Sequence, residues 1–306
     1  MNTVNTASYI KTYTSGELHR RIEKAERILA KCRLCPRNCT VNRMNGERGV
    51  CRVGRLPVVS SFSPHFGEEA PLVGQHGSGT IFLTSCNLSC IFCQNWDISH
   101  LREGKEISIE AFAQIMVHLQ GMGCHNINFV TPTHFVTQIL EALPRAIEMG
   151  LSVPLVYNTG GYDSVETLKL LDGVFDIYMP DFKYWDEEVA QRLSKAPGYP
   201  EAARAAIREM HRQVGNLVVD ARGLAQRGLL VRHLVLPEGL SGTRDIMRFL
   251  AQEISPDTYV NIMDQYYPCG EAGDYPPLNR RLTRMEYRQA LNEARAEGIH
   301  RFDSRS

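Results

Sequence analysis

The feature that most constrains the fold is a series of six short apolar runs that alternate with amphipathic segments between residues 80 and 263. Continuous runs of Val, Ile, Leu and Phe between helices are typical of parallel strands buried on both faces. Six such units in a row predict an α/β fold, a partial (β/α)6 TIM-like barrel, although an open doubly wound sheet has the same pattern. We expect strands at 80–84, 126–131, 153–158, 174–179, 229–236 and 258–263, and helices near 108–120, 134–149, 164–172, 201–214 and 243–253.

The first quarter of the chain has a different pattern. Apolar residues at helical spacing predict a helix over 16–31, whereas 32–79 lacks periodicity and is rich in Cys, Gly, Pro and Arg. We therefore expect two units. Residues 1–79 form an N-terminal helix and a small irregular Cys-rich metal-binding subdomain, and residues 80–306 form the core with a C-terminal extension. Within that extension, 264–281 is expected to be a surface loop and 283–297 a last helix.

Composition and charge exclude several functions. Lys+Arg and Asp+Glu both number 34, and a nucleic-acid binder usually shows a basic excess, so nucleic acid is an unlikely partner. No apolar stretch of about 18 residues predicts a membrane span, and the first residues lack the apolar segment of a signal peptide. Seven of the nine cysteines fall in two tight clusters, which in a reducing compartment indicate metal ligands before disulfides. We expect a cytoplasmic protein.

The central cysteine cluster is Cys86, Cys90 and Cys93, in the segment TSCNLSCIFCQNWD directly after the first expected strand. Three thiolates can bind three irons of a four-iron cube, whereas ordinary ferredoxin clusters take four. The fourth iron then needs a ligand from outside the chain. A zinc knuckle is the alternative, but zinc sites usually have paired CxxC units and four protein ligands.

The segment CNLSCIFC, with Phe92 before the last cysteine, resembles the signature of the radical S-adenosylmethionine superfamily. The resemblance implies a [4Fe–4S] cluster whose open iron binds S-adenosylmethionine through its amino group and carboxylate. One electron, from a donor such as flavodoxin or ferredoxin, then cleaves the cofactor to a 5′-deoxyadenosyl radical. Other segments across residues 32–300 resemble the activating enzymes of pyruvate formate-lyase and other glycyl radical enzymes. That branch implies hydrogen abstraction from a protein or peptide, while a small molecule or an RNA remains open as the substrate.

The same resemblance implies a set of cofactor-binding residues at the ends of the later strands. NFVTPTHF stands where many relatives have a Gly-Gly-Glu turn, which places Thr131 and Thr133 near the amino group of the cofactor. YNTGGYD and MPDFKY end the next two strands. There, Asn158, Thr159, Met179 and Asp181 match positions that hold a monovalent cation in the activating enzymes, although Asn158 replaces an acidic residue.

Two basic residues complete this set. Lys183 can offset the charge of a cofactor or substrate carboxylate. Arg232 lies within an apolar run, where a guanidinium needs an anionic partner. The next residue, His233, faces the other side of the strand and is interpreted as structural. No side chain is assigned a catalytic role.

The N-terminal cluster is Cys32, Cys35, Cys39 and Cys51. Four thiols satisfy either a tetrahedral zinc site or a second [4Fe–4S] cluster, and Gly46 and Gly49 let the chain fold back to deliver Cys51. The segment has too little apolar content to order itself, so metal binding would contribute to its folding.

Two functions from other classes stay open. A non-catalytic iron–sulfur or zinc protein, serving electron transfer or redox sensing, would recruit Cys124 or Cys269 as a fourth ligand of the central cluster. A nucleic-acid-binding zinc ribbon would show salt-dependent affinity, and the neutral charge argues against it.

Overall fold

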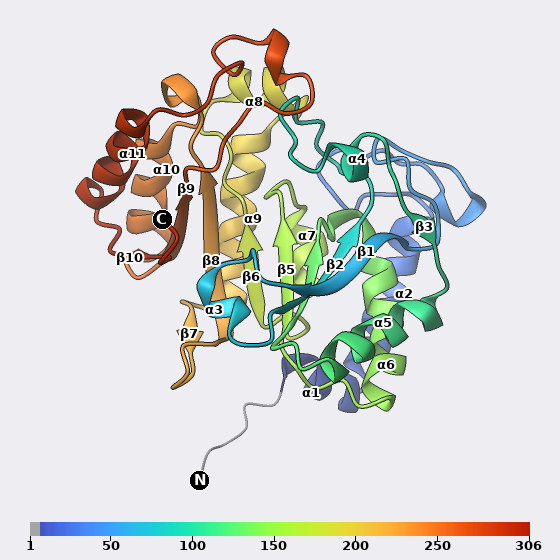
Figure 1. Ribbon diagram of the computed structural model, residues 1–306. Coiled ribbons are helices and arrows are strands. Elements are labelled where there is room, and N and C mark those ends of the chain that lie inside the picture. The colour runs from blue at the N-terminus through green and yellow to red at the C-terminus, as the bar shows by residue number, and fades with distance from the viewer. Residues whose placement is uncertain (1–6) are drawn as a thin grey trace.

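The computed structural model describes residues 7–306, whose strands form one mostly parallel sheet (Figure 1). The strand order is β10-β9-β8-β6-β5-β4-β2-β1-β3, and β7 pairs with β8. The strands are β1 (Val58–His65), β2 (Ser78–Leu83), β3 (Lys105–Glu106), β4 (Ile127–Val130), β5 (Leu155–Thr159), β6 (Ile177–Pro180), β7 (Val218–Val219), β8 (Ala225–Leu234), β9 (Tyr259–Met263) and β10 (Arg301–Phe302).

The order of the strands decides between the two architectures that the sequence allows. Strands β2, β4, β5, β6, β8 and β9 are neighbours in chain order, and every pair is parallel. A doubly wound sheet would reverse its order at a switch point, and this sheet does not. The path ends at β3 on one side and β10 on the other. The expected partial (β/α)6 barrel is therefore confirmed.

Each expected helix is present between the strands, with ends shifted by a few residues. Across residues 7–306, no helix combines the length and apolar character needed to span a bilayer. The helices are α1 (Ser8–Thr14), α2 (Glu17–Leu29), α3 (Ala70–Val73), α4 (Trp96–Ser99), α5 (Ile109–Gly121), α6 (Val136–Glu148), α7 (Val165–Lys169), α8 (Glu187–Ser194), α9 (Tyr199–Val214), α10 (Thr243–Phe249), which continues as a π-helical turn (η4, Leu250–Ile254), and α11 (Arg284–Ala296), with short 3-10 turns η1 (Arg43–Asn45), η2 (Thr133–Phe135), η3 (Pro237–Gly239) and η5 (Ala272–Asp274).

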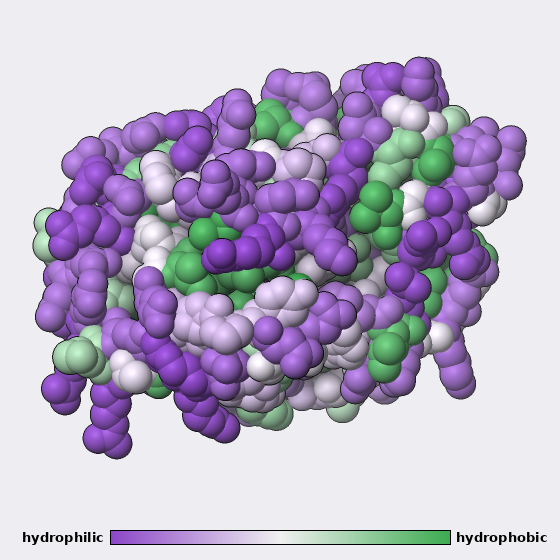
Figure 2. Space-filling model, turned by 90° about the horizontal axis from the view of Figure 1, so that it is seen from above, coloured by the Kyte–Doolittle hydropathy of each residue, from purple (hydrophilic) through white to green (hydrophobic). Residues whose placement is uncertain are grey.

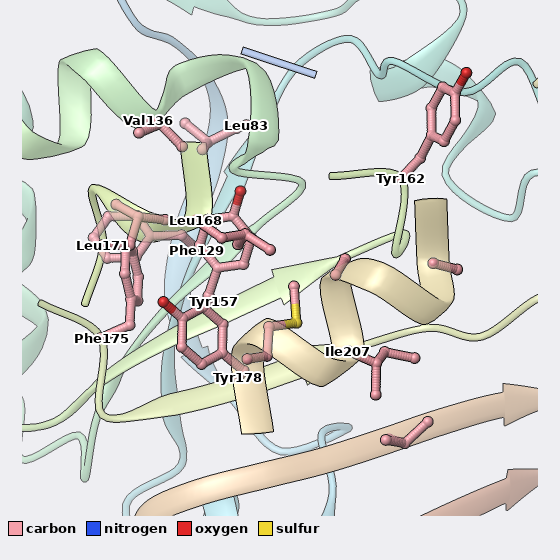
Figure 3. Packing of buried hydrophobic residues seen from close by; sticks show 14 of the residues in the cluster. Leu83, Phe129, Val136, Tyr157, Tyr162, Leu168, Leu171, Phe175, Tyr178 and Ile207 are labelled. Atoms are coloured by element: carbon pink, nitrogen blue, oxygen red, sulfur yellow. The ribbon is translucent and has the colours of Figure 1, made fainter. Parts of the chain in front are cut away.

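Alternate residues of each strand face opposite sides of the sheet, as the pleat requires. The outward face packs against the helices. Tyr157 and Tyr178 meet Phe175 edge-on or tilted, and Ile207 of α9 lies beside them (Figure 3). This layer forms the main core of the molecule.

The inward face packs against the N-terminal segment. Val156, Ile177 and Leu230 form a second apolar cluster, with Leu72 of α3 among them. Figure 1 shows β1 and α3 crossing the near side of the sheet while α9 lies behind it. The N-terminal segment therefore fills the inside of the partial barrel, where the strands alone would leave it open.

The expectation that residues 32–79 are irregular is wrong in its second half. β1 pairs antiparallel with β2, and α3 follows it. The sequence of β1, VVSSFSPH, does not indicate a strand, because its solvent side carries Ser. It also contains Pro64, and a strand accepts proline only where the missing N–H is not needed for pairing. The short helices α1 and α8 were also not predicted.

The first helices also pack on the barrel. α2 lies against α6, where Thr137 donates to the Ala25 carbonyl at 3.3 Å, and Arg55 pairs with Glu141 at 2.6 Å. Residues before and after position 79 share one apolar core. The proposed division into units 1–79 and 80–306 stays a prediction.

Candidate functional site

The three central cysteines lie on one loop at the carboxyl end of β2. Ser194 at the end of α8 donates to Cys90 Sγ at 2.9 Å, and Ser99 of α4 donates to Cys93 Sγ at 3.1 Å. Burial raises the pKa of Cys86 and Cys90. Buried thiols of this kind become thiolates when a positive metal centre is bound, and hydroxyl donors then stabilise the sulfur charge.

The loop is held in place from two sides. The Ser89 and Ile91 amides donate to the carbonyls of Ser194 and Leu193 in α8, at 3.0 and 2.9 Å. Phe92 packs edge-on against Tyr184 and Tyr266, with ring centroids 6.4 and 5.8 Å apart. The unpredicted helix α8 is therefore the element that fixes the geometry of the cysteine loop.

Two adjoining cavities open in front of the thiols. The smaller, of about 130 Å³, is lined by all three cysteines, and the larger, of about 320 Å³, shares Cys90 and Cys93 with it. Figure 2 views the molecule from above Figure 1, toward the carboxyl ends of the strands, and shows apolar residues gathered near the middle of that face within a hydrophilic rim. Six of the seven predicted cofactor-binding residues line the smaller cavity: Thr131, Asn158, Thr159, Asp181, Lys183 and Arg232.

No fourth cysteine of the described chain lines either cavity. Cys124 is buried just before β4, at the opposite end of the strands, with its Sγ 3.9 Å from the His76 carbonyl. Cys269 lies in the loop after β9 but does not reach the cavities. The residues present therefore fit a cluster that takes three thiolates from the chain and leaves one iron open.

The charged residues of the site form one network. Asp181 accepts from Arg232 Nε at 2.8 Å and from Lys183 Nζ at 2.5 Å, and Arg232 Nη2 donates to Asn158 Oδ1 at 2.8 Å. Burial alone would raise the pKa of Asp181, but Arg232 and Lys183 hold it below its ordinary value. The anionic partner that the sequence requires for Arg232 is therefore Asp181.

Thr133 is the one predicted cofactor-binding residue that does not line a cavity. Its hydroxyl donates to Asp163 Oδ1 at 2.7 Å, and the Thr159 hydroxyl donates to Asp163 Oδ2 at 2.6 Å. Tyr157 adds a third donor at 2.9 Å. Sequence reasoning missed Asp163, which ties the loops after β4 and β5 together. The position of Asp163 in the sequence could have indicated this role, because an Asp shortly after an apolar strand needs buried partners.

Sequence reasoning also missed two carboxylates on the segment between β1 and α3. Glu68 lines the larger cavity, with Oε2 3.8 Å from Arg232 Nη1, and burial raises its pKa to about 7. Glu69 accepts from Asn261 at 3.0 Å, while its Oε2 is buried without a partner. No motif marks these residues, because their role depends on β1 crossing the barrel.

His233 has the structural role expected from its strand position. Its Nδ1 lies 2.8 Å from the Phe182 carbonyl and its Nε2 2.9 Å from the Thr243 hydroxyl. Burial lowers its pKa to about 4, so the ring is neutral at physiological pH.

The four N-terminal cysteines line a third, small cavity, together with Arg37, Arg43 and His134. Gly46 has φ +83°, and a Cβ on Gly49 would lie 2.7 Å from Cys39 Sγ. Both glycines thus let the chain return to Cys51, as predicted. Within residues 7–306, no three His, Cys, Asp or Glu side chains are gathered tightly enough to hold a single metal ion.

Comparison with known proteins agrees with this geometry. Residues 80–221 match the model of the Radical SAM superfamily. The chain is also 35% identical over 300 residues to the uncharacterized protein MJ0674 of Methanocaldococcus jannaschii, covering 95% of this chain and 81% of that protein. The chain belongs to the radical SAM superfamily. As a radical SAM protein it is an enzyme of radical chemistry, and membership implies a [4Fe–4S] cluster and S-adenosylmethionine.

Further matches are more distant. The uncharacterized protein MJ0808 of the same organism is 23% identical over 296 residues, covering 89% of this chain and 80% of that protein. Among solved structures, HydG, a maturase of the [FeFe]-hydrogenase, is 12% identical, with a TM-score of 0.49, covering 72% of this chain and 49% of HydG. A radical SAM methyltransferase from Sphaerobacter thermophilus is 15% identical, with a TM-score of 0.48, covering 74% of this chain and 66% of that chain. The chain thus spans about half of HydG.

Proposed function

We propose that this radical SAM enzyme abstracts a hydrogen atom from a protein or peptide, in the manner of the glycyl radical activating enzymes. The observation that carries the proposal is the open pair of cavities beside three, and only three, thiols of the described chain. When bound, the cluster and S-adenosylmethionine supply a 5′-deoxyadenosyl radical by one-electron cleavage. The chain's own residues hold these groups and exclude water from them.

The smaller cavity carries a net positive charge that suits the carboxylate of the cofactor. Lys183 and Arg232 bring two positive charges against the one negative charge of Asp181, and Asn158 lines the same cavity. Thr131, with φ +61°, turns the chain at the end of β4 and borders the same space. We propose that these side chains orient S-adenosylmethionine, and that Thr133 acts only through Asp163.

The monovalent cation is the weakest part of the resemblance to the activating enzymes. Both Asp181 carboxylate oxygens and Asn158 Oδ1 already accept from Arg232 or Lys183. A cation at this place would have to displace one of these groups. We propose that the Arg232 guanidinium supplies the positive charge instead.

The larger cavity is the proposed substrate site. Its volume of about 320 Å³ suits one side chain or a short turn of a peptide, and it lies at the low end of the range for small-molecule sites. We propose a one-electron donor such as flavodoxin or ferredoxin, a reducing cytoplasmic location, and a zinc ion or second cluster on the four N-terminal thiols. An EPR doublet on a candidate partner protein would identify a glycyl radical and so separate a protein substrate from a small molecule or an RNA.

The proposal is tested with anaerobically reconstituted protein, dithionite and S-adenosylmethionine. We expect 5′-deoxyadenosine from the wild type and none from the triple variant C86A/C90A/C93A. Wild-type protein with an intact, reduced cluster that forms no 5′-deoxyadenosine would overturn the proposal. The variants C124A and C269A serve as controls, because neither cysteine reaches the cavities. Loss of the cluster in either one would favour a non-catalytic four-ligand protein.

A further inference from the structure

The N-terminal cavity is built for an anionic occupant. Arg43 is fully buried, and its hydrogen bonds go to the carbonyls of Gly54, at 2.8 and 3.1 Å, and of His134, at 2.8 Å. Arg37 Nη2 is buried without a hydrogen-bond partner, and the guanidinium lies over the Tyr162 ring at 5.4 Å from its centroid. Among the described residues, no carboxylate hydrogen-bonds either guanidinium, although a buried charge requires an opposite one. Four thiolates around a metal centre carry a net negative charge and would supply it.

The spacing of the thiols separates the two candidate centres. A zinc ion bonds sulfur at about 2.3 Å, which places four tetrahedral sulfurs about 3.8 Å apart. The four thiols line one cavity, yet no three of them are gathered closely enough for a single ion. A [4Fe–4S] cube holds its cysteines farther apart, because each thiolate binds a different iron. The arrangement therefore fits a cluster better than zinc.

Asn87, in the central cysteine loop, connects this loop to the N-terminal cavity. Arg37 Nε donates to the Asn87 carbonyl at 2.8 Å, and Asn87 Oδ1 lies 3.9 Å from Cys86 Sγ. The Asn87 carboxamide also hydrogen-bonds the Cys35 thiol of the N-terminal site. Asn87 therefore lies between a thiol of each site, and its Nδ2 is fixed by the Tyr162 carbonyl at 2.7 Å.

A second connection runs through His134, which lines the N-terminal cavity. Its carbonyl accepts from Arg43, and its Nε2 lies 2.9 Å from the carbonyl of Thr84, two residues before Cys86. Asn87, His134 and Arg43 are buried, and Arg37 is half-buried. The surface over the N-terminal site is open to a partner, because Met44 and Val50 are exposed there.

We propose that Cys32, Cys35, Cys39 and Cys51 hold a second [4Fe–4S] cluster that passes electrons to the cluster at Cys86, Cys90 and Cys93. A reduced flavodoxin or ferredoxin loses one electron to the N-terminal cluster. That cluster is reoxidised when it reduces the central cluster by one electron, and no bond forms or breaks in the transfer. The inference deepens the proposed function, because it assumes a central cluster that needs an electron.

Metal analysis tests the second cluster. We expect about eight irons per chain in reconstituted wild type and about four in both C86A/C90A/C93A and C35A/C51A. The first variant should retain the EPR signal of a reduced cluster. If C86A/C90A/C93A held one zinc ion and no iron, or no metal at all, the proposal would be overturned.

Rapid mixing with a reduced flavodoxin tests the transfer. EPR of frozen samples follows reduction of the central cluster, identified by the change of its signal with S-adenosylmethionine. We expect C35A/C51A to lose reduction by flavodoxin but to keep reduction by dithionite, which reaches the central cluster directly. Equal rates with flavodoxin in variant and wild type would overturn the relay. Failure to form 5′-deoxyadenosine with dithionite would instead overturn the proposed function.

The variant R37Q keeps all four N-terminal cysteines, so its result does not depend on whether the cysteine variants fold. Removal of a positive charge that lines the N-terminal cavity should lower the reduction potential of the N-terminal cluster more than that of the central cluster. R33Q is the matched control, because Arg33 is exposed on the same segment. Unchanged potentials in R37Q would contradict a cluster at this place.

Discussion

Arg232 Nε lies 2.8 Å from Asp181 Oδ1, and this pair joins β8 to β6 directly beneath the cysteine loop. Asn158, Lys183 and Glu68 surround the pair, so that the guanidinium of β8 lies among polar groups of β5, of the segment after β6 and of the segment that crosses the barrel. The position of this arginine couples the stability of the barrel to the geometry of its site.

Removal of Arg232 should therefore destabilise the protein strongly. R232M leaves Glu68 largely buried without its cationic partner and Asp181 with Lys183 alone, and breaking a buried pair in this way costs up to about 3–5 kcal/mol. Urea unfolding of the metal-free protein measures the change. R145M is the matched control, since the Arg145–Glu110 pair is exposed to solvent and should contribute little to the free energy of unfolding. Similar losses in the two variants would contradict the central role of Arg232.

Ionisation of the buried Glu68 carboxyl should lower the free energy of unfolding as the pH rises. Its pKa is raised to about 7 in the folded state by burial, above the ordinary value of 4.5, so the folded protein binds the proton more tightly than the unfolded chain. This contribution to the free energy of unfolding is lost as the pH rises from about 4.5 to about 7. We expect the free energy of unfolding of E68Q to depend less on pH over this range than that of the wild type.

Chemical denaturation of the metal-free protein at several pH values measures this effect. E188Q is the control, because Glu188 is exposed at the start of α8. Two results would show that Glu68 does not titrate as described. One is a wild-type free energy of unfolding that rises with pH over the same range, and the other is the same pH dependence in E68Q as in the wild type.

The Gly49 position should control metal retention at the N-terminal site. In G49A the new Cβ would lie 2.7 Å from Cys39 Sγ and 2.8 Å from Cys39 Cβ, so the thiol must move away from the cavity. We expect metal at this site to be lost on gel filtration while the central cluster stays. G54A is the control, because its Cβ would approach only Arg48, at 3.9 Å. Full metal content in G49A would exclude Cys39 as a ligand.

Ser194 should tune the central cluster. Its hydroxyl accepts from Tyr184 at 2.7 Å and donates to Cys90 Sγ at 2.9 Å, and hydrogen bonds to cluster sulfurs stabilise the reduced, more negative state. We expect S194A to lower the reduction potential of the central cluster, as measured by EPR-monitored titration. S61A, on the exposed face of β1, should leave that potential unchanged.

Much of the fold follows from the sequence, because parallel buried strands such as β4 and β5 are continuous apolar runs that few other structures tolerate. The position of β1 does not follow, since its half-exposed, serine-rich sequence lacks the apolar run that marks the other strands, and its pairing with β2 depends on the tertiary fold. Asp181 and Arg232 could be anticipated, because a charge at the end of an apolar strand needs a partner. Glu68 and Asn87 could not, because each acts through a segment distant in sequence.

The central claim is that three cysteines hold a cluster with one iron open to S-adenosylmethionine. The most direct measurement is electron–nuclear double resonance on the reduced holoprotein with S-adenosylmethionine carrying ¹⁵N in its amino group. We expect a ¹⁵N coupling to the cluster in the wild type and in C124A and C269A. A cluster that shows no such coupling, and whose fourth iron is bound by a side chain of the protein, would contradict it.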